Sequence, residues 1–97
     1  MTENRERDIT TYAKPVSEAQ YAFSQAFRRA YALSDKIEKA EKRLAKAIAR
    51  NRERPAPYWE REIAEEKHKL VHLRRAKAEA DAAVETAREN LPLSERE

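Results

Sequence analysis

Glycine and cysteine are both absent from this chain of 97 residues. Without glycine, the phosphate-binding loops of nucleotide enzymes and the glycine-flanked turn that presents a catalytic serine cannot be formed. Without cysteine, disulfide bonds and cysteine-based zinc sites are excluded. No apolar run approaches the roughly 20 residues of a membrane-spanning helix, and the charged N-terminal sequence does not resemble a signal peptide. We therefore expect a cytoplasmic protein with no enzymatic activity, cofactor, small-molecule substrate or membrane contact.

Charged residues are abundant, making up 40% of the chain, and the mean hydropathy is −1.05. Much of the apolar share is alanine, so each helical turn has little apolar area to bury. A small domain with one thin core is marginally stable, and oligomerisation is a common remedy. We therefore expect a protein partner, most simply a second copy in a dimer. The richness in alanine, arginine and glutamate is typical of small bacterial or phage proteins, and for a phage-encoded protein the expected compartment is the cytoplasm of the host.

A proline-containing break divides the body of the chain. Pro55 and Pro57 end a first helix, because proline removes a backbone donor and clashes with the preceding turn. The short connection makes the two helices antiparallel neighbours. The predicted fold is all-α: a long antiparallel two-helix hairpin, coiled-coil-like, that self-association or a partner completes into a bundle. The predicted segments are an arm over 1–16, a hairpin over 17–91 with helices over 17–53 and 57–90 and a turn over 54–57, and a tail over 92–97.

Local patterns support this organisation. Ser17 followed by Gln20 is a capping-box pattern, in which each side chain binds the backbone of the other residue at the start of a helix. Apolar residues then return every three or four residues in both helices, as in a coiled-coil seam. Counting outward from the turn places Phe27 near Val84. The polar residues 1–16 form either a disordered arm or a segment that docks on a partner.

Three polar residues, Glu41, Glu66 and Lys77, interrupt the predicted seam. Such residues can lie at the edge of a seam with their charged ends in solvent, or they can fix the register and the oligomeric state. The other interpretation is a site between the helices that is built on carboxylates. The sequence favours the first interpretation and leaves the second open.

An aromatic cluster lies near the start of the first helix. On a helical wheel its members spread beyond one seam, so that part of the cluster stays exposed in an isolated hairpin. Aromatic side chains beside arginine are a composition typical of protein interfaces. We therefore expect another chain to bind here. The predicted partner-binding residues are Tyr21, Phe23, Phe27, Arg28 and Tyr31.

Charge is unevenly distributed along the chain. Residues 36–77 contain fourteen Lys or Arg and seven Glu, whereas residues 78–97 contain two and six, so the hairpin tip is basic and the C-terminal end acidic. Arginine beside aromatic residues suits nucleic acid, through phosphate contacts and base stacking. The local alternative is that these arginines complement the dipole of the first helix and that the tryptophan closes the seam. The possible nucleic-acid contacts are Arg50, Arg52, Arg54, Tyr58, Trp59 and Arg61.

A metal site is a lesser alternative. Glu65 and His68 have the Glu-x-x-His spacing of ferritin-like metal bundles, and His72 follows four residues later on the same helix. At about 100° per residue, however, His68 points almost directly away from the apolar stripe of its helix. We therefore expect two solvated histidines, and a metal site only if an oligomer buries this outer face.

Overall fold

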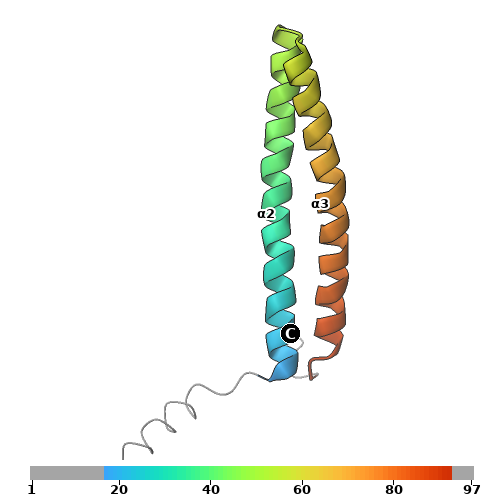
Figure 1. The fold of residues 1–97 in the computed structure, drawn as a ribbon. Coiled ribbons are helices and arrows are strands. Elements are labelled where there is room, and N and C mark those ends of the chain that lie inside the picture. Colours follow the sequence, from blue (N-terminus) through green and yellow to red (C-terminus); the bar gives the residue numbers. More distant parts are fainter. Residues whose placement is uncertain (1–16, 93–97) are drawn as a thin grey trace, which may run out of the picture.

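The computed structural model describes residues 17–92, which form two long helices joined by a short turn. Helix α2 spans Glu18–Glu53 and helix α3 spans Pro57–Glu89. The two helices lie side by side and antiparallel, and no strand occurs within the described residues (Figure 1). The all-α hairpin expected from the sequence is confirmed. The predicted arm and residues 93–97 of the predicted tail lie outside the described part of the chain.

The capping box at the start of α2 is also confirmed. The hydroxyl oxygen of Ser17 accepts a hydrogen bond from the backbone N–H of Gln20 at 3.1 Å, and the Oε1 atom of Gln20 accepts one from the backbone N–H of Ser17 at 3.2 Å. The first N–H groups of a helix have no partner within the helix, and these two bonds satisfy two such donors. The sequence therefore sets where α2 begins.

The turn is held by backbone groups and by one side chain. The backbone N–H of Arg54 donates to the carbonyl oxygen of Arg50 at 2.9 Å, which closes the last turn of α2. Asn51 then accepts a hydrogen bond on Oδ1 from the backbone N–H of Ala56 at 3.1 Å. Pro57 follows as the first residue of α3, where its missing N–H has no helical partner to lose. These contacts direct α3 back along α2.

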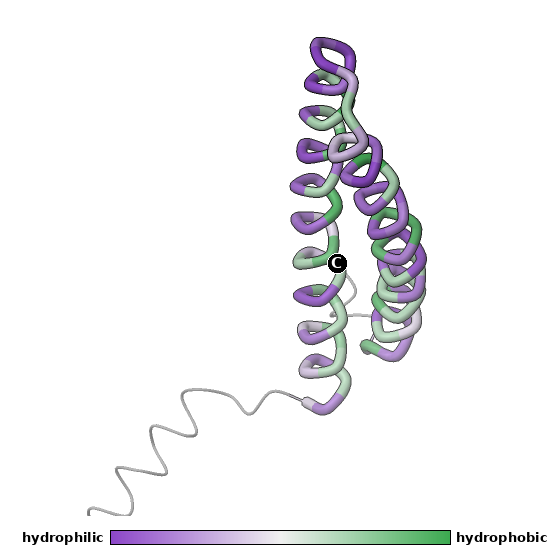
Figure 2. Tube along the Cα trace, turned by 45° about the horizontal axis from the view of Figure 1, so that its top comes forward, coloured by the Kyte–Doolittle hydropathy of each residue, from purple (hydrophilic) through white to green (hydrophobic). Residues whose placement is uncertain are grey.

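The seam between the helices is thin because alanine fills much of it. Ala40 is completely buried, with 0% exposure, and Leu70 is 2% exposed. Small side chains let the two backbones approach closely but remove little apolar area from water. Along both helices, hydrophilic and hydrophobic residues alternate within successive turns (Figure 2). The buried residues are Ala30, Ala40, Ala47, Glu66, Leu70, Ala80, Ala87 and Leu91.

Glu41, one of the polar residues that interrupt the predicted seam, lies at the edge of the seam, as the favoured interpretation of the sequence expects. The side chain of Glu41 is 51% exposed, and its Oε2 atom accepts a hydrogen bond from Nη2 of Arg74 at 3.0 Å. The seam position is taken by Ala40, which follows Leu33 at the seven-residue spacing of a coiled coil. Glu41 lies about 100° farther round the helix. It therefore joins the helices across their edge.

Candidate functional site

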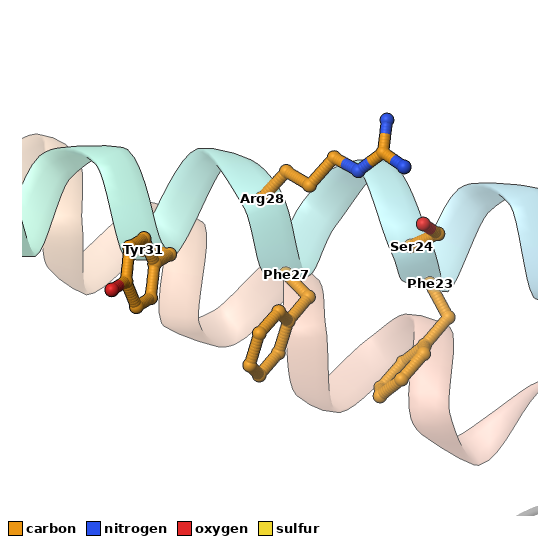
Figure 3. Close-up of a pocket in the computed structure, with 5 residues that line it drawn as sticks. All are labelled: Phe23, Ser24, Phe27, Arg28 and Tyr31. Atoms are coloured by element: carbon orange, nitrogen blue, oxygen red, sulfur yellow. The ribbon is translucent and has the colours of Figure 1, made fainter.

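An apolar groove lies along α2 near the open end of the hairpin, opposite the turn. It has a volume of about 520 Å³. Phe23, Phe27 and Tyr31 project in a row from one side of α2, whereas Arg28 projects from the opposite edge (Figure 3). Phe27 is 55% exposed and Tyr31 71% exposed, and the rings of Phe23 and Phe27 are 6.3 Å apart. The groove is lined by Phe23, Ser24, Phe27, Arg28 and Tyr31.

A second hollow of about 220 Å³ continues this groove toward α3. The two hollows share Phe27 and Tyr31, and the second has a charged wall where Nζ of Lys77 lies 2.8 Å from Oδ2 of Asp81. We call the surface formed by both hollows the aromatic face. The lining residues of the second hollow are Phe27, Ala30, Tyr31, Ser34, Lys77, Asp81 and Val84.

The aromatic face contains four of the five residues predicted to bind a partner. Tyr21 is exposed but does not line either hollow, because it lies about 200° round α2 from Phe23. Sequence reasoning missed the contribution of α3, although the count from the turn placed Val84 beside Phe27. Continuing the same count would have brought Asp81 to this face.

At the hairpin tip, three side chains form a compact cluster. The Cζ atom of Arg50 lies 6.0 Å from the ring centre of Trp59, a cation–π distance. The rings of Tyr58 and Trp59 are 4.8 Å apart and nearly perpendicular, at 79°. Trp59 is partly buried, whereas Tyr58 is 54% exposed. A hollow of about 240 Å³ beside this cluster is lined by Arg43, Lys46, Ala47, Tyr58, Trp59 and Glu62.

The other arginines predicted at the tip do not join this cluster. Arg52 follows Arg50 by two residues and so lies about 200° round α2 from it. Arg61 has the same relation to Trp59 on α3. Both side chains, and that of Arg54 in the turn, are exposed. The structure therefore brings one of the four predicted arginines onto the tryptophan.

A buried carboxylate occupies the middle of the seam. Glu66 is 3% exposed. Its two carboxylate oxygens accept hydrogen bonds from Nε of Arg43 at 3.1 and 3.2 Å, and Nζ of Lys69 lies 3.4 Å from Oε1. The two cations outnumber the one carboxylate, and both keep more than half of their side-chain area exposed. Glu66 therefore acts as an anchor that holds cations at the surface of the hairpin.

The histidines lie together on the outer side of α3. The Nε2 atoms of His68 and His72 are 3.2 Å apart, and both residues are exposed. Within residues 17–92 there is no group of three or more metal-binding side chains that includes Glu65 or any other acidic residue. Of the three candidate metal ligands considered from the sequence, the structure brings only the two histidines together.

Neither described helix has an apolar stretch of the length and hydrophobicity needed to cross a bilayer. No protein-family model matches the chain, and searches of curated proteins and of solved structures gave no significant match.

Proposed function

We propose that this chain is a non-enzymatic protein–protein interaction module that pairs with a second copy of itself through the aromatic face. The observation that carries the proposal is the exposure of Phe27 and Tyr31 beside two continuous hollows. Single exposed apolar residues are common on protein surfaces, but a contiguous apolar surface with a polar rim is typical of interfaces. Two hairpins together make a four-helix bundle, in which a second layer of apolar side chains is buried.

Apolar residues on α3 extend the aromatic face toward the tip. Ala78 precedes Asp81 by three residues, so the two lie on the same side of α3. Val71 lies two turns before Ala78 on that side of α3 and is 53% exposed. Arg74, three residues after Val71, forms an ion pair with Glu41 across the hairpin. The surface available to a second copy therefore includes the middle of the hairpin as well as its open end.

Charge favours an antiparallel arrangement of the two copies. Residues 36–77 around the tip have a surplus of seven positive charges, and residues 78–92 at the open end have four acidic and one basic residue. When the hairpins overlap in opposite directions, the acidic end of each copy lies beside the basic tip of the other. Such complementarity selects the orientation of an interface. Asp81 lies about as far from the C-terminal end of α3 as Lys67 lies from its N-terminal end at the turn. When α3 of one copy runs antiparallel to α3 of the other, Asp81 of each copy therefore lies beside Lys67 of the other.

Sedimentation equilibrium tests the proposal directly. At micromolar concentration the wild-type chain should have twice its monomer mass, and the double variant Phe27→Ala, Tyr31→Ala should have the mass of one chain. Tyr58→Ala, which removes an exposed aromatic residue from outside the aromatic face, is the matched control and should remain a dimer. Circular dichroism checks that all three proteins stay helical. A monomeric wild-type chain, or a double variant that still pairs, contradicts the proposal.

A further inference from the structure

One side of α2 carries a line of positively charged residues. Arg29, Lys36, Arg43 and Arg50 follow one another at intervals of seven residues, which places them on the same side of a coiled-coil helix. Two lysines fill the second and third gaps, each three residues after one of these cations and four before the next, whereas Ala32 lies in the first gap. No acidic residue occupies a position in this line. We call it the basic stripe: Arg29, Lys36, Lys39, Arg43, Lys46 and Arg50.

The basic stripe is long and exposed. From Arg29 to Arg50 it spans 21 residues, or about 32 Å at roughly 1.5 Å per residue. All six side chains are exposed. Lys39 pairs with the exposed Asp35, and Arg43 is held by Glu66, whereas Lys36 has no ion pair within residues 17–92. Exposed ion pairs are weak, so an anionic ligand can replace Asp35 as the partner of Lys39.

Aromatic side chains lie at the tip end of the stripe. Arg50, its last residue, lies against Trp59, and the hollow beside Trp59 is also lined by Arg43 and Lys46. Tyr58 borders the same hollow with more than half of its surface exposed. A line of cations that leads to an exposed ring is the combination that binds single-stranded nucleic acid, with cations on the phosphates and the ring on a base.

The stripe and the aromatic face lie on different sides of α2. Arg29 follows Phe27 by two residues, which is a rotation of about 200°. Pairing of two hairpins through the aromatic face therefore leaves both stripes open to solvent. We propose that the basic stripe, together with Tyr58, binds single-stranded nucleic acid, DNA or RNA, through its phosphate backbone and one stacked base.

Binding can be measured by fluorescence anisotropy with labelled oligo(dT) and oligo(rU) of about 12 nucleotides, within the site sizes of about 4–16 nucleotides known for single-strand binders. With four to six phosphates neutralised, the logarithm of the affinity should fall with the logarithm of salt concentration with a slope of about −3 to −4. The two oligomers show whether DNA or RNA is preferred, and a duplex of the same length should bind more weakly than either.

The double variant Lys36→Gln, Lys46→Gln removes two stripe cations and keeps good helix formers. We expect it to weaken binding about tenfold at low salt and to reduce the salt slope by about 1.4, because two phosphate contacts are lost. Arg75→Gln with Arg88→Gln removes the same net charge from exposed positions on α3, outside the stripe, and should change affinity less than twofold.

Tyr58→Ala tests the stacked base and should weaken binding of both oligomers about tenfold, without changing the salt slope. Inorganic polyphosphate, which has no bases, should compete poorly. The proposal is overturned by the absence of binding at low salt, by tighter binding of duplex, by equal losses in the two charge variants, or by competition from polyphosphate as strong as that from oligo(dT).

Discussion

Arg43 and Glu66 join the two helices by a hydrogen-bonded ion pair in which the glutamate side chain is buried and the arginine side chain remains about half exposed. Glu66 takes a seam position where the neighbouring layers hold alanine or leucine. A buried carboxylate is strongly destabilising unless its oxygens accept hydrogen bonds, and here both oxygens accept one from the same Nε atom. The pair therefore fixes which residues of α2 and α3 lie at the same level.

Removing the exposed arginine of this pair should destabilise the hairpin more than replacing the buried glutamate with an apolar residue. Arg43→Ala leaves Glu66 with Lys69 alone, and we expect it to lower the free energy of unfolding by about 2 kcal/mol, since bonds to charged groups contribute roughly 1.5–3 kcal/mol. Glu66→Leu removes the buried charge and should leave stability within about 1 kcal/mol of wild type, or raise it. Urea unfolding at one fixed protein concentration measures both effects.

The control is the exposed pair of Arg74 and Glu41, whose N–O distance of 3.0 Å is as short as that of the buried pair. Because surface pairs contribute about 0–1 kcal/mol, Arg74→Ala should change stability by less than that. Equal losses of unfolding free energy in Arg43→Ala and Arg74→Ala would mean that the burial of Glu66 does not strengthen its ion pair.

Among the alanines of residues 17–92, Ala40 should be the least tolerant of enlargement. Its side chain is completely buried where the helices approach, and added methyl groups in a packed core typically cost about 1–3 kcal/mol. We expect Ala40→Leu to lower the free energy of unfolding by about that amount. Ala32→Leu, at an exposed position eight residues earlier on the side of α2 away from the aromatic face, should change it by less than about 0.5 kcal/mol. Thermal unfolding followed by circular dichroism separates the two, and similar effects at both sites would contradict the packing described.

Some features of this hairpin could be predicted from the sequence because they depend on local chemistry. Ser17 and Gln20 specify their capping box within four residues, and proline at Pro55 and Pro57 prevents continuation of α2 whatever the tertiary structure. The position of Phe27 beside Val84 required only a count from the turn. These features depend on spacing along the chain, which the sequence states directly.

Other features depend on side-chain packing and side-chain directions, which the spacing along the sequence does not determine. Glu41 and Ala40 are neighbours, and both fit a seam within the tolerance of a helical wheel. The close approach of the helices selects the smaller side chain and leaves Glu41 to bind Arg74. The contact of Arg50 with Trp59 depends on the directions of two long side chains, and four arginines near one tryptophan looked equivalent until those directions were known.

The orientation of the proposed dimer can be tested by reversing charges. In an antiparallel pair Asp81 of each copy lies beside Lys67 of the other, so Asp81→Lys places like charges together at two symmetric places. We expect this variant to weaken pairing about tenfold or more at low salt, and to do so less at high salt, because exposed charges are screened within about 10 Å at 0.1 M. Sedimentation equilibrium at two salt concentrations measures the change.

Compensation identifies the partner of Asp81. The double variant Asp81→Lys, Lys67→Glu restores opposite charges across an antiparallel pair and should recover most of the lost affinity. Asp81→Lys also removes the ion pair with Lys77 on its own helix, and Lys67→Glu cannot repair that local loss. Recovery in the double variant therefore reports contact between copies. The control variant combines Asp81→Lys with Arg75→Glu, which reverses a charge at an exposed position outside the aromatic face. This variant has the same net charge as the first double variant but should not recover affinity, which separates specific pairing from an effect of net charge. Equal recovery in both double variants would rule out the antiparallel arrangement.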